Sequence, residues 1–395
     1  MSRRRWVILA VGTFAQAATC SFVYGMPMLV PALRSRDDLT LFQASLLVSA
    51  PIVGLLATLI VWGALADRYG ERVVIVSGVG TAAALLVVVP FVGALGALAV
   101  VLAVAGAAAA SVNAASGRMV MGWFPVHERG LAMGTRQTAQ PLGVALAALA
   151  LPSLARAHGA REALLFPAAL CLLGALSVLL FAADPARATS SSGVGAASPY
   201  RGSRTLGRIH VASAMLVVPQ FAIATFTLAY LAGARHWDPA VAGRWVFGFA
   251  AAGALGRIAA GVWSDRVGSR LGPMRQLAVL SAGLMLLIGL GALLGAGWIV
   301  VGFALGAVVT VADNGLAYTA VAEFAGTSWS GRALGVQNTG QNVAAVLTAP
   351  ALAAVIGDSR YALGFAVAAI CPLLAIPLTP VRGDRTRATT VTAAR

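Results

Sequence analysis

The sequence predicts an all-α membrane protein with twelve transmembrane helices in two six-helix bundles. First, 59% of its residues are hydrophobic and only 10% are charged, whereas soluble domains carry about 25% charged residues. Second, uncharged apolar stretches of about 20 residues recur, each long enough to cross ~30 Å of hydrocarbon as a helix. The period-2 alternation of a membrane β-barrel is not seen. Third, the first half of the chain resembles the second.

The apolar stretches define the expected helices in chain order. The twelve spans lie at residues 6–33, 43–65, 73–95, 97–122, 130–155, 162–183, 209–233, 241–263, 275–296, 298–323, 331–356 and 361–380. The first span follows three arginines, so a cleaved signal peptide is the alternative. Its apolar run continues to Leu33, however, which is too long for the hydrophobic region of such a peptide. Cleavage would also leave an odd number of spans.

The arginines indicate how the spans are oriented. The chain contains no lysine, so arginine alone supplies the positive side of its net charge of +15. With the N-terminus inside, 20 of the 28 arginines fall at cytoplasmic ends of spans and seven at outer ends. This is the positive-inside bias. We therefore expect a multi-pass protein of the cytoplasmic (inner) membrane with both termini in the cytoplasm, and no nucleic-acid partner.

The two halves of the chain repeat each other at an offset of 198 to 204 positions. The matched pairs are Asp67 with Asp265, Gln16 with Gln220, Asn113 with Asn314, Gln137 with Asn338, Gln140 with Gln341 and Cys171 with Cys371. We expect an N-terminal bundle over residues 1–183, a cytoplasmic linker over 184–208, a C-terminal bundle over 209–380 and a basic cytoplasmic tail over 381–395. Parallel repeats are a recurring transporter plan, with the substrate site where the repeats meet.

Charged stretches between the spans carry a recognisable motif. The first stretch is GALADRYGERVV, which begins at Gly63. A weaker copy, GRIAAGVWSDRVGSR, begins at Gly256, and a third stretch between the two, GWFPVHERGLAMG, begins at Gly122. Together they resemble the loop signatures of the major facilitator superfamily, and the resemblance covers nearly the whole chain. It implies two six-helix bundles and a gating role for the motif residues. These are Gly63, Asp67, Arg68, Gly70 and Arg72 in the first copy, and Gly261, Asp265, Arg266 and Gly268 in the second.

The chemistry of the first copy suggests how it gates. Gly63 has no side chain, so another helix can approach closely. Asp67 can accept hydrogen bonds from the positive N-terminus of the span that begins near Gly331. The resemblance implies that this contact latches the inner ends of the two halves, with Glu71, Glu128 and the motif arginines completing a charge cluster. The alternative is ordinary loop charge, which explains the arginines but not Asp67. Glu71 departs from the commonest family motif, which has a basic residue there.

Two ionisable residues lie deep in the expected spans. Asp313 is near the middle of span 298–323, where a charged side chain costs ~3 kcal/mol unless paired or hydrated, and it is our proton-coupling candidate. The alternative is a protonated Asp313 that bonds within the core. Arg136 lies about 9 Å along its helix. It can hold an anion, pair with Asp313, or extend back to the interface.

Polar residues inside the spans complete the candidate substrate cavity, which in the family is surrounded by helices one, four, seven and ten. The candidates are Arg136, Gln16, Tyr24, Asn113, Gln140, Gln220, Tyr230, Asn314, Tyr318, Gln337 and Gln341. The alternative is that they only join helices, through hydrogen bonds of about 0.6–2 kcal/mol each.

These observations favour a secondary active transporter. No nucleotide-binding loop, metal-ligand spacing or catalytic set is seen, so we expect no enzyme activity, no metal and no cofactor. We expect a monomer that moves a small-molecule substrate by alternating access, driven by a proton or other ion gradient, and Arg136 favours an organic anion. A multidrug/proton antiporter is the alternative, although AQPLGVA around Pro141 lacks most glycines of the drug-antiporter motif. A non-transporting membrane sensor or scaffold on the same fold is more distant.

Overall fold

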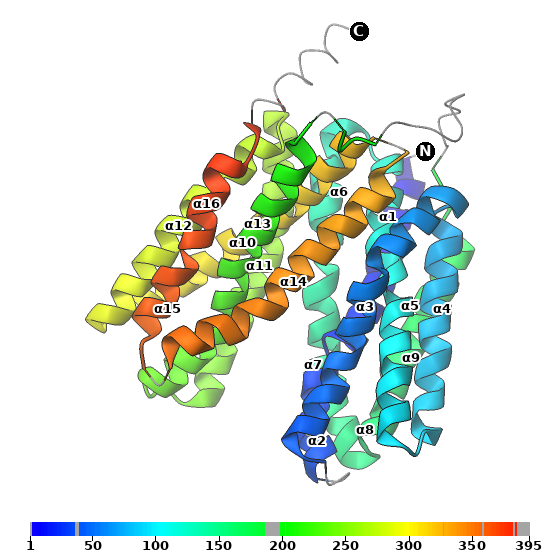
Figure 1. The fold of residues 1–395 in the computed structure, drawn as a ribbon, viewed down its shortest axis with the longest axis horizontal. Helices are drawn as coiled ribbons and strands as arrows, with labels where there is room; N and C mark the ends of the chain where they lie inside the picture. Colours follow the sequence, from blue (N-terminus) through cyan, green and yellow to red (C-terminus); the bar gives the residue numbers. More distant parts are fainter. Residues whose placement is uncertain are drawn as a thin grey trace, which may run out of the picture. The chain divides into compact units, whose positions relative to one another are not determined.

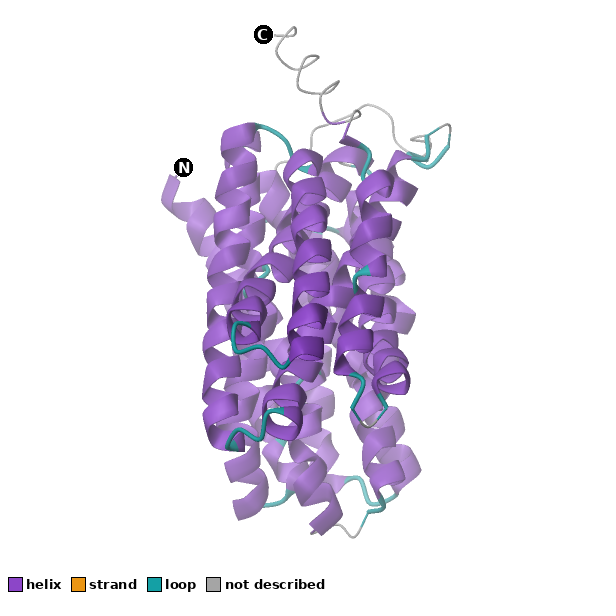
Figure 2. Cartoon of the chain, turned by 90° about the vertical axis from the view of Figure 1, so that its left-hand side faces the viewer, coloured by secondary structure: helices purple, strands orange, loops and turns teal. Residues whose placement is uncertain are grey.

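The computed structural model describes residues 2–35, 39–185, 198–201, 203–326, 328–357, 359–381 and 384. These residues form helices and loops, and no strand occurs among them (Figure 2). Most of the expected linker, 184–208, and of the expected tail, 381–395, lies outside the described residues.

The helices follow one another along the chain in two runs (Figure 1). The first run is α1 (Ser2–Val23), η1 (Met26–Leu29), α2 (Val30–Ser35), α3 (Leu41–Tyr69), α4 (Glu71–Val88), η2 (Val89–Phe91), α5 (Leu95–Trp123), η3 (Val126–Glu128), α6 (Arg129–Arg136), α7 (Ala139–Ala157), α8 (Ala160–Ala163) and α9 (Leu165–Phe181). The second run is α10 (Thr205–Ala229), η4 (Tyr230–Ala234), α11 (Pro239–Val267), α12 (Leu271–Leu294), α13 (Ile299–Ala325), α14 (Ser330–Ile356), α15 (Tyr361–Ala368) and α16 (Ile370–Leu378).

The predicted number of membrane spans is confirmed. Within the described ranges, 12 helical segments are long and apolar enough to cross a membrane. Some expected spans are divided, however. The first ends as a helix at Val23, before η1 and α2. The fifth is broken between α6 and α7, because Pro141 has no N–H to donate to the Gln137 carbonyl four residues earlier.

The chain forms two compact units. Unit 1 comprises Met1–Phe124, Thr138–Ala196 and Gly326–Asn338, and unit 2 comprises Pro125–Gln137, Ala197–Ala325 and Thr339–Arg395. The division differs from the two sequence halves in two short segments. The segment with α6 comes from the first half but packs in unit 2, against α11 and α13. The start of α14 comes from the second half but belongs to unit 1.

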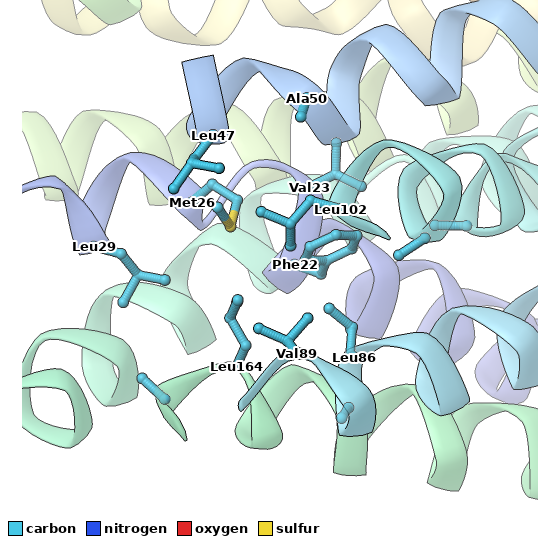
Figure 3. Packing of buried hydrophobic residues seen from close by; sticks show 14 of the residues in the cluster. Phe22, Val23, Met26, Leu29, Leu47, Ala50, Leu86, Val89, Leu102 and Leu164 are labelled. Atoms are coloured by element: carbon cyan, nitrogen blue, oxygen red, sulfur yellow. The ribbon is translucent and has the colours of Figure 1, made fainter. Parts of the chain in front are cut away.

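The core of unit 1 joins its helices through large apolar side chains and close backbone contacts. Figure 3 shows Phe22, Leu86 and Leu102 directed toward one another from α1, α4 and α5, and each is no more than 1% exposed. Lipid is as apolar as these side chains, so tight packing rather than burial from water must favour helix association. Small residues allow it: a Cβ on Gly106 of α5 would collide with the Pro51 backbone of α3.

The core of unit 2 contains an aromatic cluster. The ring of Phe303 on α13 lies between those of Tyr230 and Phe365, with centroid distances of 5.7 Å and 5.5 Å. Tyr361 contacts Tyr230 edge to face at 5.3 Å. These rings join η4, α13 and α15 at one end of the unit, and the edge-to-face geometry is one that aromatic pairs prefer.

Candidate functional site

Asp67 lies at the N-terminus of α14 in unit 1. Its carboxylate accepts hydrogen bonds from the backbone N–H groups of Gly331 at 3.0 Å and Arg332 at 3.2 Å. The first N–H groups of a helix have no acceptor within the helix and carry the positive end of its dipole. Gly63 makes the approach possible, because a Cβ there would collide with the Gly331 carbonyl. Gly63 and Asp67 therefore hold the start of α14 against the end of α3.

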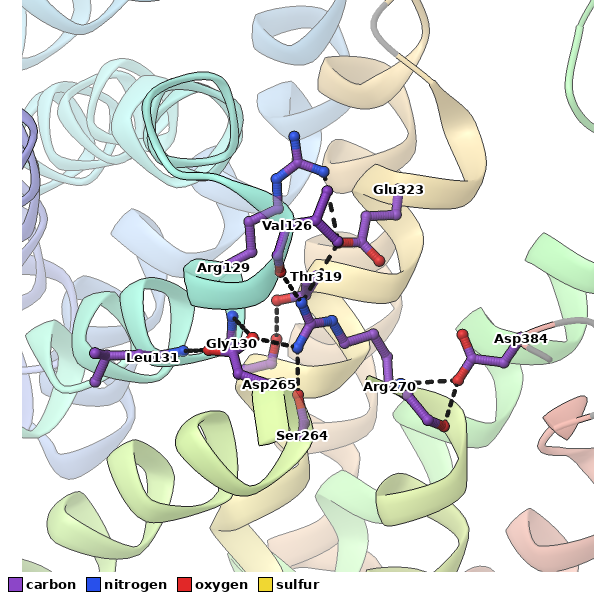
Figure 4. Close-up of polar contacts among 12 residues, drawn as sticks. Val126, Arg129, Gly130, Leu131, Ser264, Asp265, Arg270, Thr319, Glu323 and Asp384 are labelled. Atoms are coloured by element: carbon purple, nitrogen blue, oxygen red, sulfur yellow. Dashed lines mark hydrogen bonds and ion pairs between the residues drawn. The ribbon is translucent and has the colours of Figure 1, made fainter. Parts of the chain in front are cut away.

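Asp265 forms the same arrangement in unit 2, at the N-terminus of α6 (Figure 4). Its two carboxylate oxygens accept hydrogen bonds from the N–H groups of Gly130 at 2.9 Å and Leu131 at 2.8 Å. A Cβ on Gly261 would collide with the carbonyl oxygen of Gly130. Each copy of the motif therefore caps a helix start that comes from the other half of the sequence.

The remaining motif residues shape the turn after each aspartate. Gly70 has a φ of 98° and Gly268 a φ of 66°, a region that residues with a Cβ seldom adopt. Arg68 and Arg266 are exposed at the helix ends, and Arg68 lies 5.2 Å from the centre of the Tyr69 ring. Ordinary loop charge is sufficient to explain these two arginines.

The two caps take different arginines as ion-pair partners. In unit 1, Arg118 on α5 pairs with Asp67 and with Glu71, each at 2.6 Å. Glu71, which stands where the family motif commonly has a basic residue, is 1% exposed. It therefore gives Arg118 a second buried carboxyl as an ion-pair partner. In unit 2 the partner is Arg270, the last residue of the second motif copy, at 2.6 Å from Asp265.

The unit 2 cluster extends further, as Figure 4 shows. Glu323 on α13 lies 3.7 Å from Arg270 and 3.6 Å from Arg129. Arg270 also donates to the Val126 carbonyl at 2.6 Å. Glu128, which the sequence placed near the unit 1 motif, belongs instead to the segment that packs in unit 2.

Two aspartates that sequence reasoning missed cap the helices that follow the motifs. Asp184 accepts a hydrogen bond from the Arg72 N–H at 2.8 Å, at the start of α4. Asp384 accepts from the N–H groups of Arg270 and Leu271, both at 2.8 Å, at the start of α12. The side chain of Arg72 donates to the Leu179 carbonyl and not to Asp67. The repeat offset could have found this pair, since each aspartate follows the last span of its half.

Buried amide side chains form matching hydrogen bonds in the two units. In unit 1, Gln16 on α1 donates to Asn113 on α5 at 3.1 Å. In unit 2, Asn314 on α13 donates to Gln220 on α10 at 2.9 Å. These four residues are the repeat mates that the sequence alignment paired. Gln341 on α14 extends the second pair, donating to Asn314 at 3.2 Å and to Ser213 at 2.7 Å.

Arg136 lies inside unit 2 and does not reach the surface. Only 1% of it is exposed, its guanidinium donates to the Gln137 side chain at 2.9 Å, and it lies 5.6 Å from the centre of the Tyr318 ring. Arg257 on α11 is 5% exposed and donates to the Gln137 carbonyl, the group that Pro141 leaves without its helical partner. The carbonyl left without a helical donor at the break between α6 and α7 thus accepts a hydrogen bond from a buried arginine.

Asp313 is the acidic member of this region. It is 3% exposed, the charge of Arg257 acts on it, and its Oδ2 atom accepts no hydrogen bond from the residues that are described. Among the described residues, Asp313 does not form the ion pair with Arg136 that the sequence offered as one alternative.

The other cavity candidates are distributed over both units. Tyr24 packs against the core of unit 1, and Tyr230 is 3% exposed in the aromatic cluster of unit 2. Gln140 is half-buried on α7, and Gln337 is 1% exposed on α14. No group of three or more His, Cys, Asp or Glu residues that could hold a metal ion is found in the described ranges.

Twelve apolar spans among the described residues, an internal repeat and a matching helix cap in each half define a multi-pass membrane protein with two compact units. The chain belongs to the Major Facilitator Superfamily, whose family model matches residues 9–349.

Known proteins support this membership. The chain is 42% identical over 380 residues to an uncharacterized MFS-type transporter of Mycobacterium tuberculosis, covering 96% of this chain and 85% of the relative. Its fold resembles that of the Escherichia coli fucose:proton symporter, with a TM-score of 0.75, 16% identity and coverage of 96% and 98%. It also resembles the human organic anion transporter MFSD10, with a TM-score of 0.69, 18% identity and coverage of 95% and 99%.

Proposed function

We propose that the chain is a secondary active transporter that moves a small organic anion across the cytoplasmic membrane by alternating access, coupled to protons. The observation that carries the proposal is the charge buried inside unit 2. Arg136 and Arg257 are 1% and 5% exposed and both act on Tyr318, and Asp313, which is 3% exposed, is the buried carboxyl on which the charge of Arg257 acts. Two guanidinium groups against one carboxyl leave an excess of positive charge.

Buried positive charge is costly, and an anion would offset that cost. Moving a charge from water into a low-dielectric interior costs several kcal/mol, by order of magnitude, and nearby opposite charge offsets that cost. The Tyr318 ring and the Gln137 oxygen stabilise the Arg136 guanidinium in part. A carboxylate-bearing solute would bring a negative charge to the two arginines and accept paired hydrogen bonds from the N–H groups of a guanidinium.

Asp313 supplies a reason for coupling. When its carboxyl is ionised, the cluster of Arg136, Arg257 and Asp313 has a net charge of one positive unit, and when it is protonated the net charge is two. Anion binding is therefore stronger with the proton bound. By reciprocity, bound anion favours bound proton. This linkage favours movement of the anion and the proton in the same direction.

The cap on α6 connects this cluster to the motif. Arg136 lies six residues after Gly130, about 9 Å along the helix. A movement of α6 that breaks the Asp265 hydrogen bonds would carry the Arg136 guanidinium with it. We propose that such movements of α6 and α14 gate access, and that the arginine bias places the capped ends on the cytoplasmic side.

A ligand-stabilisation screen tests the anion site. Purified protein in detergent is screened against organic acids, amines, sugars and drugs, and each variant is compared with its own ligand-free state. Bound ligand stabilises by about 2.7 kcal/mol at a concentration 100 times Kd. We expect organic acids to stabilise the wild type and Arg136→Lys, but not Arg136→Gln.

The exposed Arg244 provides the matched control, since Arg244→Gln removes the same charge from the surface. If drugs or bulky cations alone stabilise the wild type, and Arg136→Gln responds as the wild type does, the organic-anion proposal is wrong. The multidrug/proton antiporter then becomes the better description.

A further inference from the structure

A second positively charged site lies in unit 2, at the opposite end of α12 from the Asp384 cap. A groove of about 810 Å³ is lined there by the end of α12, by η4 with Arg235, and by the first turns of α15. Arg235 and Arg360 line it from segments 125 positions apart in the sequence. None of the described residues that line it is an aspartate or glutamate.

The groove has a polar end and an apolar wall. Arg235 and Arg360 each lie just beyond the end of a span, Thr205–Ala234 and Tyr361–Leu378 respectively. The wall consists of leucines in the last turns of α12. Leu286, Leu290 and Leu293 are 47%, 47% and 72% exposed, so they face the surroundings of the protein and not its core. From Leu286 to Leu293 the wall extends about 10 Å along the helix axis.

Both arginines line this groove, and a backbone contact holds Arg235 in place. The Arg235 guanidinium donates to the carbonyl of Gly295, the C-cap residue of α12. A guanidinium has five N–H donors, so this bond uses a small part of its capacity. Arg360 is exposed, one residue before α15. The Tyr361 ring, packed edge to face on Tyr230, forms part of the lining beside it.

Two arginines beside an apolar wall are suited to a ligand that has an anionic head and a hydrocarbon chain. Guanidinium groups bind phosphate oxygens through paired, charge-assisted hydrogen bonds. A leucine wall that lines the same groove and lies on the membrane-spanning helix Leu271–Leu294 fits a hydrocarbon chain. We propose that this groove binds an anionic phospholipid, with the phosphate at Arg235 and Arg360 and an acyl chain along the leucines of α12. This site is separate from the Arg136 cluster and does not depend on the proposed function.

Lipid retention tests the proposal. The full chain is reconstituted in vesicles of phosphatidylglycerol and phosphatidylethanolamine, extracted in mild detergent, and its retained lipids are counted by native mass spectrometry. We expect the wild type to retain phosphatidylglycerol preferentially. Arg235→Gln and Arg360→Gln should each weaken that retention on the order of tenfold, because each removes charge-assisted hydrogen bonds. Arg360→Lys should retain more than Arg360→Gln.

Arg244→Gln is the matched control, since this exposed arginine has the same charge and does not line the groove. Equal retention of the two lipids by the wild type would overturn the proposal, and so would an equal loss in Arg244→Gln and Arg360→Gln. Displacement of phosphatidylglycerol by inorganic phosphate at low concentration would also overturn it, because the site would then serve a soluble anion. If Arg235→Gln does not fold, Arg360→Gln still decides, because Arg360 lies outside the helix ends that Arg235 secures.

Discussion

Asp67 and Gly331 are 264 positions apart in sequence, yet the Gly331 N–H donates to the Asp67 carboxylate at 3.0 Å. Asp265 and Gly130 form the equivalent hydrogen bond at 2.9 Å. The same cap is therefore made twice, each time between segments from different halves of the chain.

Asp67→Asn should weaken the cap of α14 without unfolding the protein. The amide oxygen still accepts one hydrogen bond, but the charge that favours the helix N-terminus is lost, at a cost of about 1 kcal/mol. Cysteine labelling at the start of α14 should become faster than in the wild type. Asp265→Asn should have the same effect at the start of α6. Labelling rates identical to wild type in both variants would show that the caps do not hold these helices.

Gly63→Ala and Gly261→Ala should be destabilising, each by about 1–3 kcal/mol, because the added Cβ collides with a carbonyl oxygen and forces two helices apart. Gly80→Ala on α4 is the matched control, since no described atom lies within 4 Å of its Cβ position. That variant should be neutral or slightly stabilising. Thermal unfolding in detergent measures all three. A loss in Gly80→Ala as large as in Gly63→Ala would remove the steric explanation.

Arg118→Gln should be more destabilising than Glu71→Gln. It removes the ion-pair partner of Glu71 and the nearer of the two arginines beside Asp67, and breaking a buried ion pair costs about 3–5 kcal/mol. The double variant Arg118→Gln with Glu71→Gln should recover part of the loss, since one of the two carboxyls is then neutral. Unfolding midpoints of the four proteins complete a double-mutant cycle. A double variant that is no more stable than Arg118→Gln would indicate that Arg118 stabilises by packing alone.

Gln16→Leu and Gln220→Leu should have similar effects, because the two residues occupy equivalent positions and bond to equivalent asparagines. Each removes one hydrogen bond from a buried asparagine, at about 0.6–2 kcal/mol on the scale of polar contacts in membranes. Cycles with Asn113→Ala and Asn314→Ala measure the coupling. If the Gln–Asn pair contributes to stability in one unit and not in the other, the two units share the geometry of this contact but not its interaction free energy.

Asp313→Asn should separate coupling from transport. Exchange of the anion across vesicle membranes should persist, whereas accumulation driven by a pH gradient should be lost, because the variant cannot carry a proton at this position. Radiolabelled uptake into proteoliposomes, with and without the gradient, distinguishes the two activities. Gradient-driven accumulation at the wild-type level would assign coupling to another residue.

The sequence could predict the spans and the equivalence of the halves, because apolar length and a constant offset are properties of the chain alone. It paired Gln16 with Gln220 and Asn113 with Asn314, but it could not show that Gln16 bonds to Asn113. Aligning the two halves of the sequence identifies equivalent positions. A contact between two helices depends instead on which face each helix turns toward the other, and the alignment does not give this. Tyr230 illustrates the same point, since its place among the aromatic rings follows from the rotation of η4.

The partners of the arginines were beyond sequence reasoning for a related reason. Arg118 and Arg270 serve equivalent aspartates but come from non-equivalent positions, so the repeat gives no guide to them. The repeat does extend to the polar residues after the last span of each half. Asp184 and Asp384 are 200 positions apart, which matches the repeat, but their polar surroundings are typical of a linker and a tail.

The exchange of helix starts between the two units has a consequence for the origin of the chain. The first half contains one motif aspartate, Asp67, and one helix start, that of α6, and the structure places them in different units. Two identical copies would complete both contacts by a reciprocal swap, the hallmark of a twofold-symmetric homodimer. The present chain therefore has the design expected of a duplicated and fused gene whose ancestor worked as a pair.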